Sequence, residues 1–282
     1  MEERLRVKSK DLFPAVFSRH AAAYQRRLEE IMLRGEARGR QRVIDLVEAR
    51  PGMHVLDLAC GPGTLTVRLA ALVSPDGDVV GVDLADGMLE LARSAALPNA
   101  RFLQMDMEDL SFDDHVFDAA TCGHGLQFAP NLGRALSEAN RVLKPGARFA
   151  ASVPVGGIRD SAWSAIEDVI DRRLPPAPEA SDELGTRATV SDANAFRQAA
   201  LAAGFDRVEV EVIDERVHWP SAEHFVAQCA GWWSCAARLE EINPEKRHSF
   251  MDEAVDALHK KYDGPFETTA RNHVLLAIAA GA

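Results

Sequence analysis

Residues Met53–Val67 read MHVLDLACGPGTLTV, and this stretch decides the fold expected for the chain. A short apolar run over Val55–Leu58 contains an acid, Asp57, near its end, and a turn built on Gly61 and Gly63 follows. The apolar spacing after the turn predicts the start of a helix. A strand, a glycine turn and a helix in this order bring backbone N–H groups close to a ligand. Because glycine lacks Cβ, such a turn admits a ligand at backbone distance.

Two common nucleotide-binding patterns do not fit this turn. A dinucleotide site has the pattern G-x-G-x-x-G, which requires a third glycine where the chain has Thr66. The stretch also lacks the G-x-x-x-x-G-K-[ST] pattern of a phosphate-binding P-loop. A tight strand–helix turn with no ligand is the alternative that this stretch alone leaves open.

The composition is that of an ordinary globular protein. The 282 residues are 47% hydrophobic and 27% charged, which predicts one large domain, or a domain with an insertion, with a core of normal size. The net charge of −11 argues against a nucleic-acid partner. The four cysteines form no C-x-x-C pair, and there is neither a zinc-type Cys/His spacing nor a signal-peptide or membrane-spanning run. We therefore expect a cytoplasmic protein with reduced thiols, no metal and no membrane span.

Strands and helices alternate regularly through the middle of the chain, which predicts a parallel sheet covered on both faces. Two later strands, Arg207–Val217 and His273–Ala279, predict an antiparallel pair at the sheet edge. A helix is also expected at Ser191–Ala203, with Ser191 as its N-cap. The expected parallel strands are Val55–Leu58, Asp78–Asp83, Ala100–Met105, Phe117–Thr121 and Ala147–Val153, with helices at Asp86–Ala96 and Leu132–Leu143.

The same pattern divides the chain into four regions. We expect an N-terminal helical lid over residues 1–50 and a ligand-binding core over 51–155. An insertion over 156–190 would form part of a cap. Residues 191–282 would complete the core and carry a second helical cap insertion at about 221–262.

Acids or glycines follow four consecutive strands. They are Asp57, then Asp83, then Asp106, and then the Cys122–His124 segment. In an open α/β sheet, ligands bind outside the carboxyl ends of the strands. Asp83 lies 26 residues after Asp57, at a spacing where an acid can hydrogen-bond ribose hydroxyls. The ordered set predicts a ligand site along this edge.

The segment Asp57–Gly63, DLACGPG, resembles the first motif of class I S-adenosylmethionine (SAM) methyltransferases, acid-x-x-x-Gly-x-Gly. Residues from about 17 to 153 look like the ubiquinone/menaquinone-biosynthesis-type branch of that family (methyltransferase domain 11/25-like). The opening Phe17–Tyr24, FSRHAAAY, resembles F-D-x-x-A-x-x-Y, with Ser18 in place of the acid. The other matching pieces are VVGVDLADGMLELAR, FLQMDMEDLSFDDHVFDAAT and RALSEANRVLKPGARFA. The resemblance implies a Rossmann-like fold of seven mostly parallel strands with an antiparallel last strand, and SAM as cofactor with S-adenosylhomocysteine as product.

The resemblance also implies contacts to the methionine part of SAM. Gly61 and Gly63 would pack against it, and Asp57 would hold its ammonium directly or through water. Cys122 would offer its backbone carbonyl to the same ammonium. Tyr24 would close over the cofactor from the N-terminal helices.

Contacts to the adenosine part are implied in the same way. Asp83 would bond the ribose hydroxyls, while Asp106 would accept from the adenine amine and the amide of Met107 would meet a ring nitrogen. Leu84 and Met88 would line the adenine, although a plain core role fits these two residues equally well. Ala59, Cys60 and Glu108 complete the implied cofactor set.

Methyl transfer from a sulfonium mainly requires alignment of the reacting groups. A base is required only where the acceptor must lose a proton, as a hydroxyl does. His124 follows the fourth strand and is the best-placed candidate, and a histidine that merely shapes the acceptor wall is the alternative. Gln127, His218 and His20 are weaker candidates.

The acceptor pocket is expected from the N-terminal helices and the two insertions, because the four tryptophans of the chain lie in these insertions or at their entry. We hypothesise a small, mostly apolar organic acceptor, secondary-metabolite or quinone-like, methylated on O, N or C. A SAM-binding enzyme that catalyses a cyclisation or decarboxylation is the alternative. A metal-dependent reaction is disfavoured because no carboxylate cluster beyond the cofactor set could hold Mg²⁺. A homodimer stays open.

Overall fold

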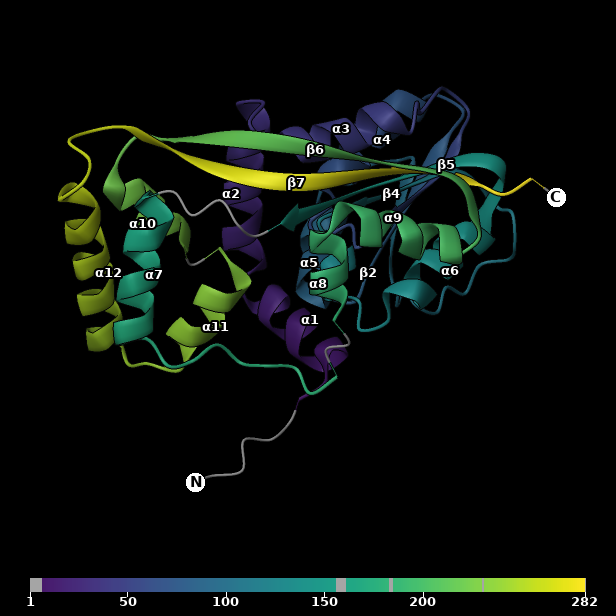
Figure 1. The fold of residues 1–282 in the computed structure, drawn as a ribbon. Coiled ribbons are helices and arrows are strands. Elements are labelled where there is room, and N and C mark those ends of the chain that lie inside the picture. The colour runs from purple at the N-terminus through teal and green to yellow at the C-terminus, as the bar shows by residue number, and fades with distance from the viewer. Residues whose placement is uncertain (1–6, 156–160, 183–184, 230, 282) are drawn as a thin grey trace.

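The computed structural model describes residues 7–155, 161–182, 185–229 and 231–281. The beginning of the expected 156–190 insertion, residues 156–160, lies outside them, as do residues 183–184. Figure 1 shows a twisted sheet with helices on both faces and a helical lobe at one end. Within these ranges, no helix is both long and apolar enough to cross a membrane.

One seven-stranded sheet organises the molecule, with the strand order β3-β2-β1-β4-β5-β7-β6. Strands β1 to β5 run parallel, and β7 pairs antiparallel with both β5 and β6. The expected α/β sheet with an antiparallel last strand is confirmed. The bounds are β1 His54–Leu58, β2 Asp78–Asp83, β3 Ala100–Gln104, β4 Phe117–Gly123, β5 Leu143–Val155, β6 Phe205–Trp219 and β7 Phe266–Ala279.

Alternation along the strands explains why both faces are covered. Successive side chains of a strand point to opposite faces. In β1, Leu56 and Leu58 face a core cluster that also contains Phe196 of α9 and residues of α6. Val55 faces a second cluster with Ile44 of α3 and residues of α4. The bounds here are α3 Arg38–Leu46, α4 Thr64–Val73, α5 Asp86–Ser94, α6 Leu132–Val142 and α9 Ala193–Ala202.

The far ends of β6 and β7 extend beyond the other strands and carry the helical lobe (Figure 1). Trp219 of β6 and Phe266 of β7 pack with Phe225 and Phe250 in a core that is separate from those under the sheet. The lobe helices are α7 Ser161–Arg173, α10 Ala222–Cys229, α11 Trp233–Glu240 and α12 Pro244–His259. The long antiparallel ribbon thus holds a second core away from the first.

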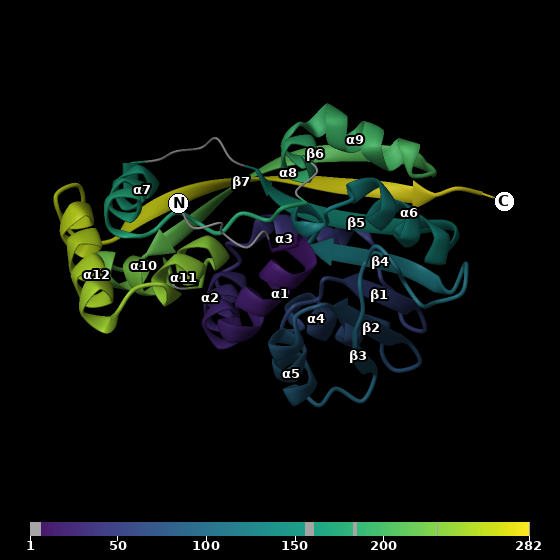
Figure 2. The same ribbon diagram turned by 90° about the horizontal axis from the view of Figure 1, so that it is seen from below.

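Two N-terminal helices lie between the lobe and the main sheet (Figure 2). They are α1 Ser9–Arg19 and α2 Ala21–Leu33, and α1 packs against both α5 and α11. At the α1–α5 contact a Cβ on Gly87 would come within 2.5 Å of the Ser18 carbonyl oxygen. The absence of a side chain at Gly87 therefore lets α1 approach the core.

Some expected boundaries were wrong. The helix expected at Ser191–Ala203 is two helices, α8 Thr186–Ser191 and α9, and the N-cap of α9 is Asp192, whose carboxylate accepts from the Ala195 N–H at 2.8 Å. Strands β6 and β7 are longer than expected because their ends pair with each other and are covered by the lobe, beyond the main sheet. A short 3-10 helix, η1 Leu126–Phe128, follows β4.

Candidate functional site

A cleft opens at the carboxyl ends of β1, β2 and β4, and we call it the strand-end cleft. The strand order switches between β1 and β4, because β2 and β3 follow on one side of β1 and β4 and β5 on the other, and such a switch point is where open α/β sheets bind ligands. The cleft holds about 760 Å³ of empty space including its mouth. Its lining includes Ala59, Gly61, Asp83, Leu84, Met88, Asp106, Met107, Gly123 and His124 from the core, and Lys10, Phe13, Phe17 and Tyr24 from α1 and α2.

The glycine turn takes the shape that its sequence indicates. Ala59, Gly61 and Gly63 all have positive φ, at 49°, 55° and 82°. A Cβ on Gly61 would meet open space, whereas one on Gly63 would lie 3.2 Å from the ring of Phe102. Gly61 therefore faces the cleft, while Gly63 lies against the side chain of Phe102 beside α5. The structure thus places Gly63 at a packing contact and outside the lining of the described cavities.

Asp83 anchors the glycine turn from the end of β2. Its two carboxylate oxygens accept hydrogen bonds from the backbone N–H groups of Gly61 and Ala85, each at 2.8 Å. Burial raises the pKa of Asp83, and these backbone hydrogen bonds oppose the rise. Each carboxylate oxygen has lone pairs for more than one donor. Asp83 can therefore hold the turn and still accept from a ligand hydroxyl.

Asp57 lies deeper than Asp83. Its side chain is buried and accepts from the hydroxyls of Thr66 at 2.6 Å and Thr121 at 2.8 Å. Burial, with a smaller contribution from the charge of Asp83, raises the pKa of Asp57 to about 6. Asp57 lines a small cavity of about 270 Å³ that adjoins the cleft, together with Tyr24, Cys60, Gly61 and Thr64.

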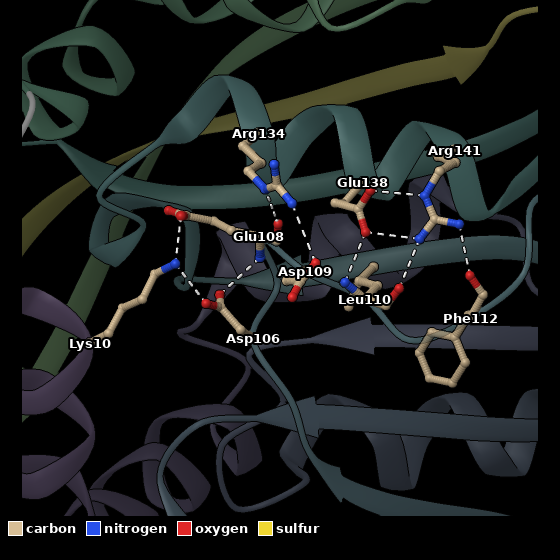
Figure 3. Close-up of polar contacts among 9 residues, drawn as sticks. All are labelled: Lys10, Asp106, Glu108, Asp109, Leu110, Phe112, Arg134, Glu138 and Arg141. Atoms are coloured by element: carbon tan, nitrogen blue, oxygen red, sulfur yellow. Dashed lines mark hydrogen bonds and ion pairs between the residues drawn. The ribbon is translucent and has the colours of Figure 1, made fainter.

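The lid helix α1 reaches the cleft through an ion pair (Figure 3). Lys10 Nζ lies 2.6 Å from carboxylate oxygens of both Asp106 and Glu108. Glu108 also accepts from the Asn131 backbone N–H at 2.6 Å and does not line the cleft. Burial lowers the pKa of Lys10, but hydrogen bonds and charge from the two acids outweigh it and raise the pKa overall. The acid expected to meet adenine is thus paired with the lid.

The segment that carries these acids is fixed to α6 (Figure 3). Arg141 donates to the carbonyl oxygens of Leu110 at 2.8 Å and Phe112 at 2.7 Å. Glu138 accepts from the Leu110 N–H at 2.8 Å and from Arg141. These side chains of α6 thus satisfy backbone N–H and C=O groups of the segment after Asp106, which holds Asp106 in a defined place.

His124 lies where two cavities meet. It has a positive φ of 62°, and its backbone N–H donates to the Ser152 carbonyl at 2.8 Å. Burial lowers the pKa of its imidazole well below the usual value, and the positive charges of Arg40 and Arg27 lower it further. The side chain of Asn272 has the opposite effect. The imidazole is therefore neutral at neutral pH.

A second cavity adjoins the cleft and holds about 1350 Å³ of empty space including its mouth, and we call it the inner cavity. Phe17, Tyr24, His124 and Phe128 line both spaces. All four tryptophans of the chain line the inner cavity: Trp163, Trp219, Trp232 and Trp233. Its polar lining includes Arg27, Arg40, Gln127, Arg187, Glu215 and Asn272.

Most of that polar lining was missed by sequence reasoning. Arg40 is one turn before Ile44 on the buried face of α3, and Glu215 shares a strand face with Val217 and Trp219. These periodicities are a signal for burial, but they carry no signal for a shared cavity. Arg40 NH2 donates to the Tyr24 hydroxyl at 3.1 Å.

Other expected residues lie away from both spaces. Cys122 is buried outside the described cavity linings, and burial raises the pKa of its thiol to about 12. His218 is exposed, because its neighbours Val217 and Trp219 take the inward face of β6. His20 lies against Glu240 at 2.7 Å on the lid. Gln127, ranked below His124, does line the inner cavity.

The fold is a Rossmann-like α/β fold, and its main cleft lies at the strand ends. Residues 55–146 match a family described as a methyltransferase domain. This match confirms the resemblance to methyltransferases that the motifs of this stretch show.

Relatives are similar to the chain in sequence, and a solved structure is similar in fold. The chain is 48% identical over 105 residues to a demethylmenaquinone methyltransferase of Symbiobacterium thermophilum, covering 36% of this chain and 42% of that protein. It is 38% identical over 141 residues to a 2-phytyl-1,4-naphtoquinone methyltransferase of Nostoc sp., covering 48% and 62%. The chain thus matches about half the length of these relatives. The YcgJ protein of Bacillus subtilis has a similar fold, with a TM-score of 0.57 and 18% identity, covering 87% of this chain and 99% of that one.

Proposed function

We propose that this protein transfers a methyl group from SAM to a small, conjugated organic acceptor. The observation that carries the proposal is that two spaces adjoin. The strand-end cleft, lined by residues of the stretch that matches the methyltransferase domain, and the tryptophan-lined inner cavity share His124 in their walls. A cofactor in the first space and an acceptor in the second would meet at that junction.

The cleft fits the adenosine part of SAM. Asp83 is already held by Gly61 and Ala85 and has lone pairs left for ribose hydroxyls. Leu84, Met88 and Met107 supply apolar lining for an adenine. Asp106 remains a candidate for the adenine amine, since a carboxylate that pairs with Lys10 retains further lone pairs.

The small cavity beside the cleft fits the methionine part. Asp57 lines it, and its own partners are the hydroxyls of Thr66 and Thr121. We therefore assign Asp57 to the cofactor ammonium through water. A buried carboxylate with a raised pKa is stabilised in its charged form by a nearby cation. The methionine end is completed by Ala59, Cys60, Gly61 and Tyr24. Outside the cavity lining, three expected residues would support the site indirectly: Gly63, Glu108 and Cys122.

The bound cofactor would supply an activated methyl group on a positively charged sulfur. The protein would contribute alignment and exclusion of water, through Phe17 and Phe128 at the junction and through α1 held by Lys10. His124 would accept a hydrogen bond from an acceptor hydroxyl, because its imidazole is neutral. A strongly lowered pKa makes it a weak base, so we assign His124 to orienting the acceptor rather than to removing a proton unaided.

The names of the similar proteins support a quinone-like acceptor. The size of the inner cavity and its tryptophan walls agree with a planar ring system. The inner cavity is built largely by elements outside residues 55–146, so the acceptor itself has to be found by screening.

The test is calorimetric titration of SAM and S-adenosylhomocysteine into wild type, Asp83→Asn and the matched control Asp76→Asn. Asp76 lies exposed in the turn before β2. We expect Asp83→Asn to weaken binding about ten-fold or more, because hydrogen bonds to charged groups contribute about 1.5–3 kcal/mol. The control should bind like wild type. A wild-type protein that binds neither compound would contradict the proposal. If SAM binds, a reaction with methyl-labelled SAM follows, and a product without the label would favour the non-methylation alternative.

A further inference from the structure

The inner cavity is unusually cationic for such an acidic chain. The protein has 43 acidic against 32 basic side chains, yet the described lining of the inner cavity has three arginines and one acid, Glu215. The strand-end cleft, by contrast, contains Asp83 and Asp106 against Lys10. Charge of this sign in a cavity concentrates anions there.

Arg40 is the most deeply buried of the three arginines, at 5% exposure. Within the described ranges its one hydrogen bond goes to the neutral hydroxyl of Tyr24, and its Nε has no partner. Glu215, the acid of the cavity, accepts from the Gly39 backbone N–H at 2.7 Å, and it attracts Arg40 through its charge without an ion pair within 4.0 Å. A buried guanidinium without a carboxylate contact is costly unless a ligand supplies the anion.

The other two guanidinium groups lie over tryptophan rings. Arg27 lies 4.9 Å from the ring centre of Trp232, and Arg187 lies 5.1 Å from that of Trp233. Stacking on a ring holds a guanidinium in place while it keeps its positive charge. That charge favours an anionic group such as a carboxylate in the same cavity.

Unsatisfied neutral groups gather in the same space. Asn272 is 1% exposed and lies close enough to His124 and Glu215 to shift the pKa of each, yet neither its Oδ1 nor its Nδ2 has a hydrogen bond of good geometry in the part of the chain described. The same is true of Gln127 Oε1 and His124 Nε2. Buried polar atoms without partners indicate a missing water or ligand. Gln127 Oε1 is an acceptor only, so its partner has to be a donor such as a hydroxyl.

We propose that the acceptor is an aromatic hydroxy acid. Its carboxylate would pair with the arginines of the inner cavity, its ring would lie among the tryptophans, and its hydroxyl would point to Gln127 and His124 at the junction with the cleft. This proposal rests on the proposed function and narrows its acceptor class. It also revises the expectation of a mostly apolar acceptor, because the apolar walls of the inner cavity carry polar side chains at defined points.

The test uses the four tryptophans, which all line this cavity. We would follow tryptophan fluorescence while titrating 3-hydroxy-2-naphthoate and 6-hydroxy-2-naphthoate, each against its carboxamide. The paired compounds have nearly the same shape and differ in charge. We would repeat both titrations with S-adenosylhomocysteine present. For at least one pair we expect the acid to bind about ten-fold more tightly than the amide, as charge-assisted hydrogen bonds are about twice as strong as neutral ones.

Arg187 is the informative position, because it lines the inner cavity and not the cleft. Arg187→Met should remove most of the preference for the acid, and Arg187→Lys should restore part of it. The matched control is Arg207→Met, at an exposed position of β6, which should keep the full preference. SAM affinity, measured by calorimetry, should be the same in all four proteins.

Each outcome separates the acceptor class from the function. Equal binding of acid and amide, or no binding of either in the presence of S-adenosylhomocysteine, overturns the hydroxy-acid proposal while the SAM titrations still stand. A second result would also overturn the hydroxy-acid proposal. In it, Arg187→Met keeps the preference for the acid, whereas Arg40→Met loses both this preference and SAM affinity. Arg40 would then be assigned to the carboxylate of the cofactor. Acid-selective binding without any SAM binding would instead overturn the proposed methyl transfer.

Discussion

The strand-end cleft and the inner cavity are built in opposite ways. The core residues of the cleft come from four strand ends and the turns that follow them, between Ala59 and Pro130. The inner cavity collects side chains from α2, α3, β6, β7 and the lobe, from Phe17 to Asn272. A site that repeats one local pattern can be inferred from the sequence, whereas a site assembled across the chain depends on how distant elements pack.

The largest expected effect is a loss of stability after a substitution in the core of the helical lobe. Phe250 is fully buried in the lobe core, and Phe250→Ala should cost about 3–5 kcal/mol, because large-to-small core changes lose contacts and leave a cavity. Since all tryptophans line the inner cavity, urea unfolding followed by tryptophan fluorescence should shift to lower urea. SAM affinity should be kept. If SAM binding is lost together with the fluorescence transition, the two regions are not separable and the comparison fails.

A smaller effect concerns the pH response of the cleft. Burial raises the pKa of Asp57 to about 6 in the folded protein, against 3.8 for an unfolded chain, so protonation of this carboxyl favours the folded state and its contribution is complete below pH 3.8. That contribution is lost as pH rises through 6, and the difference is about 3 kcal/mol at 1.36 kcal/mol per pKa unit. Asp57→Asn should therefore flatten the change in unfolding free energy between pH 4 and 7. Urea unfolding at several pH values measures this, with Asp76→Asn as control, and an unchanged slope would contradict the assignment.

The affinity for SAM should also depend on the ionisation of Asp57. A cationic ligand stabilises ionised Asp57, so SAM should bind more tightly as pH rises from 5 to 7. The inner cavity depends on arginines, which keep their charge over this range. Naphthoate binding should consequently change less than SAM binding between pH 5 and 7. Parallel titrations of SAM and naphthoate at several pH values would measure this difference between the cleft and the inner cavity. Identical pH profiles for the two ligands would contradict it.

The smallest effect should come from the lid. Lys10 pairs with Asp106 and Glu108 but is 37% exposed, so the pair should contribute no more than about 1 kcal/mol. Lys10→Met should speed hydrogen exchange in α1 without changing exchange in the sheet. Lys260→Met, at the end of α12, is the control. Unchanged exchange in α1 would show that its apolar contacts alone hold it.

Local patterns predicted the methyltransferase-type core well. Asp57, Gly61 and Asp83 could be found because a strand, a turn and an acid repeat at short range, and the sheet with its antiparallel edge followed from strand periodicity. The roles of Gly63 and Glu108 could not be predicted in this way. Gly63 meets Phe102 of β3, and Glu108 meets Lys10 of α1, which are contacts between segments far apart in the chain.

The sequence by itself determined the α/β fold and the cleft, because hydrophobic periodicity and glycine turns act over a few residues. Only the tertiary structure decided that Arg27, Arg40 and Arg187 share one cavity with four tryptophans. The physical reason is that burial and charge depend on every neighbour in space, and those neighbours come from elements that no local pattern connects. The same long-range packing placed His124, rather than His218, where the two spaces meet.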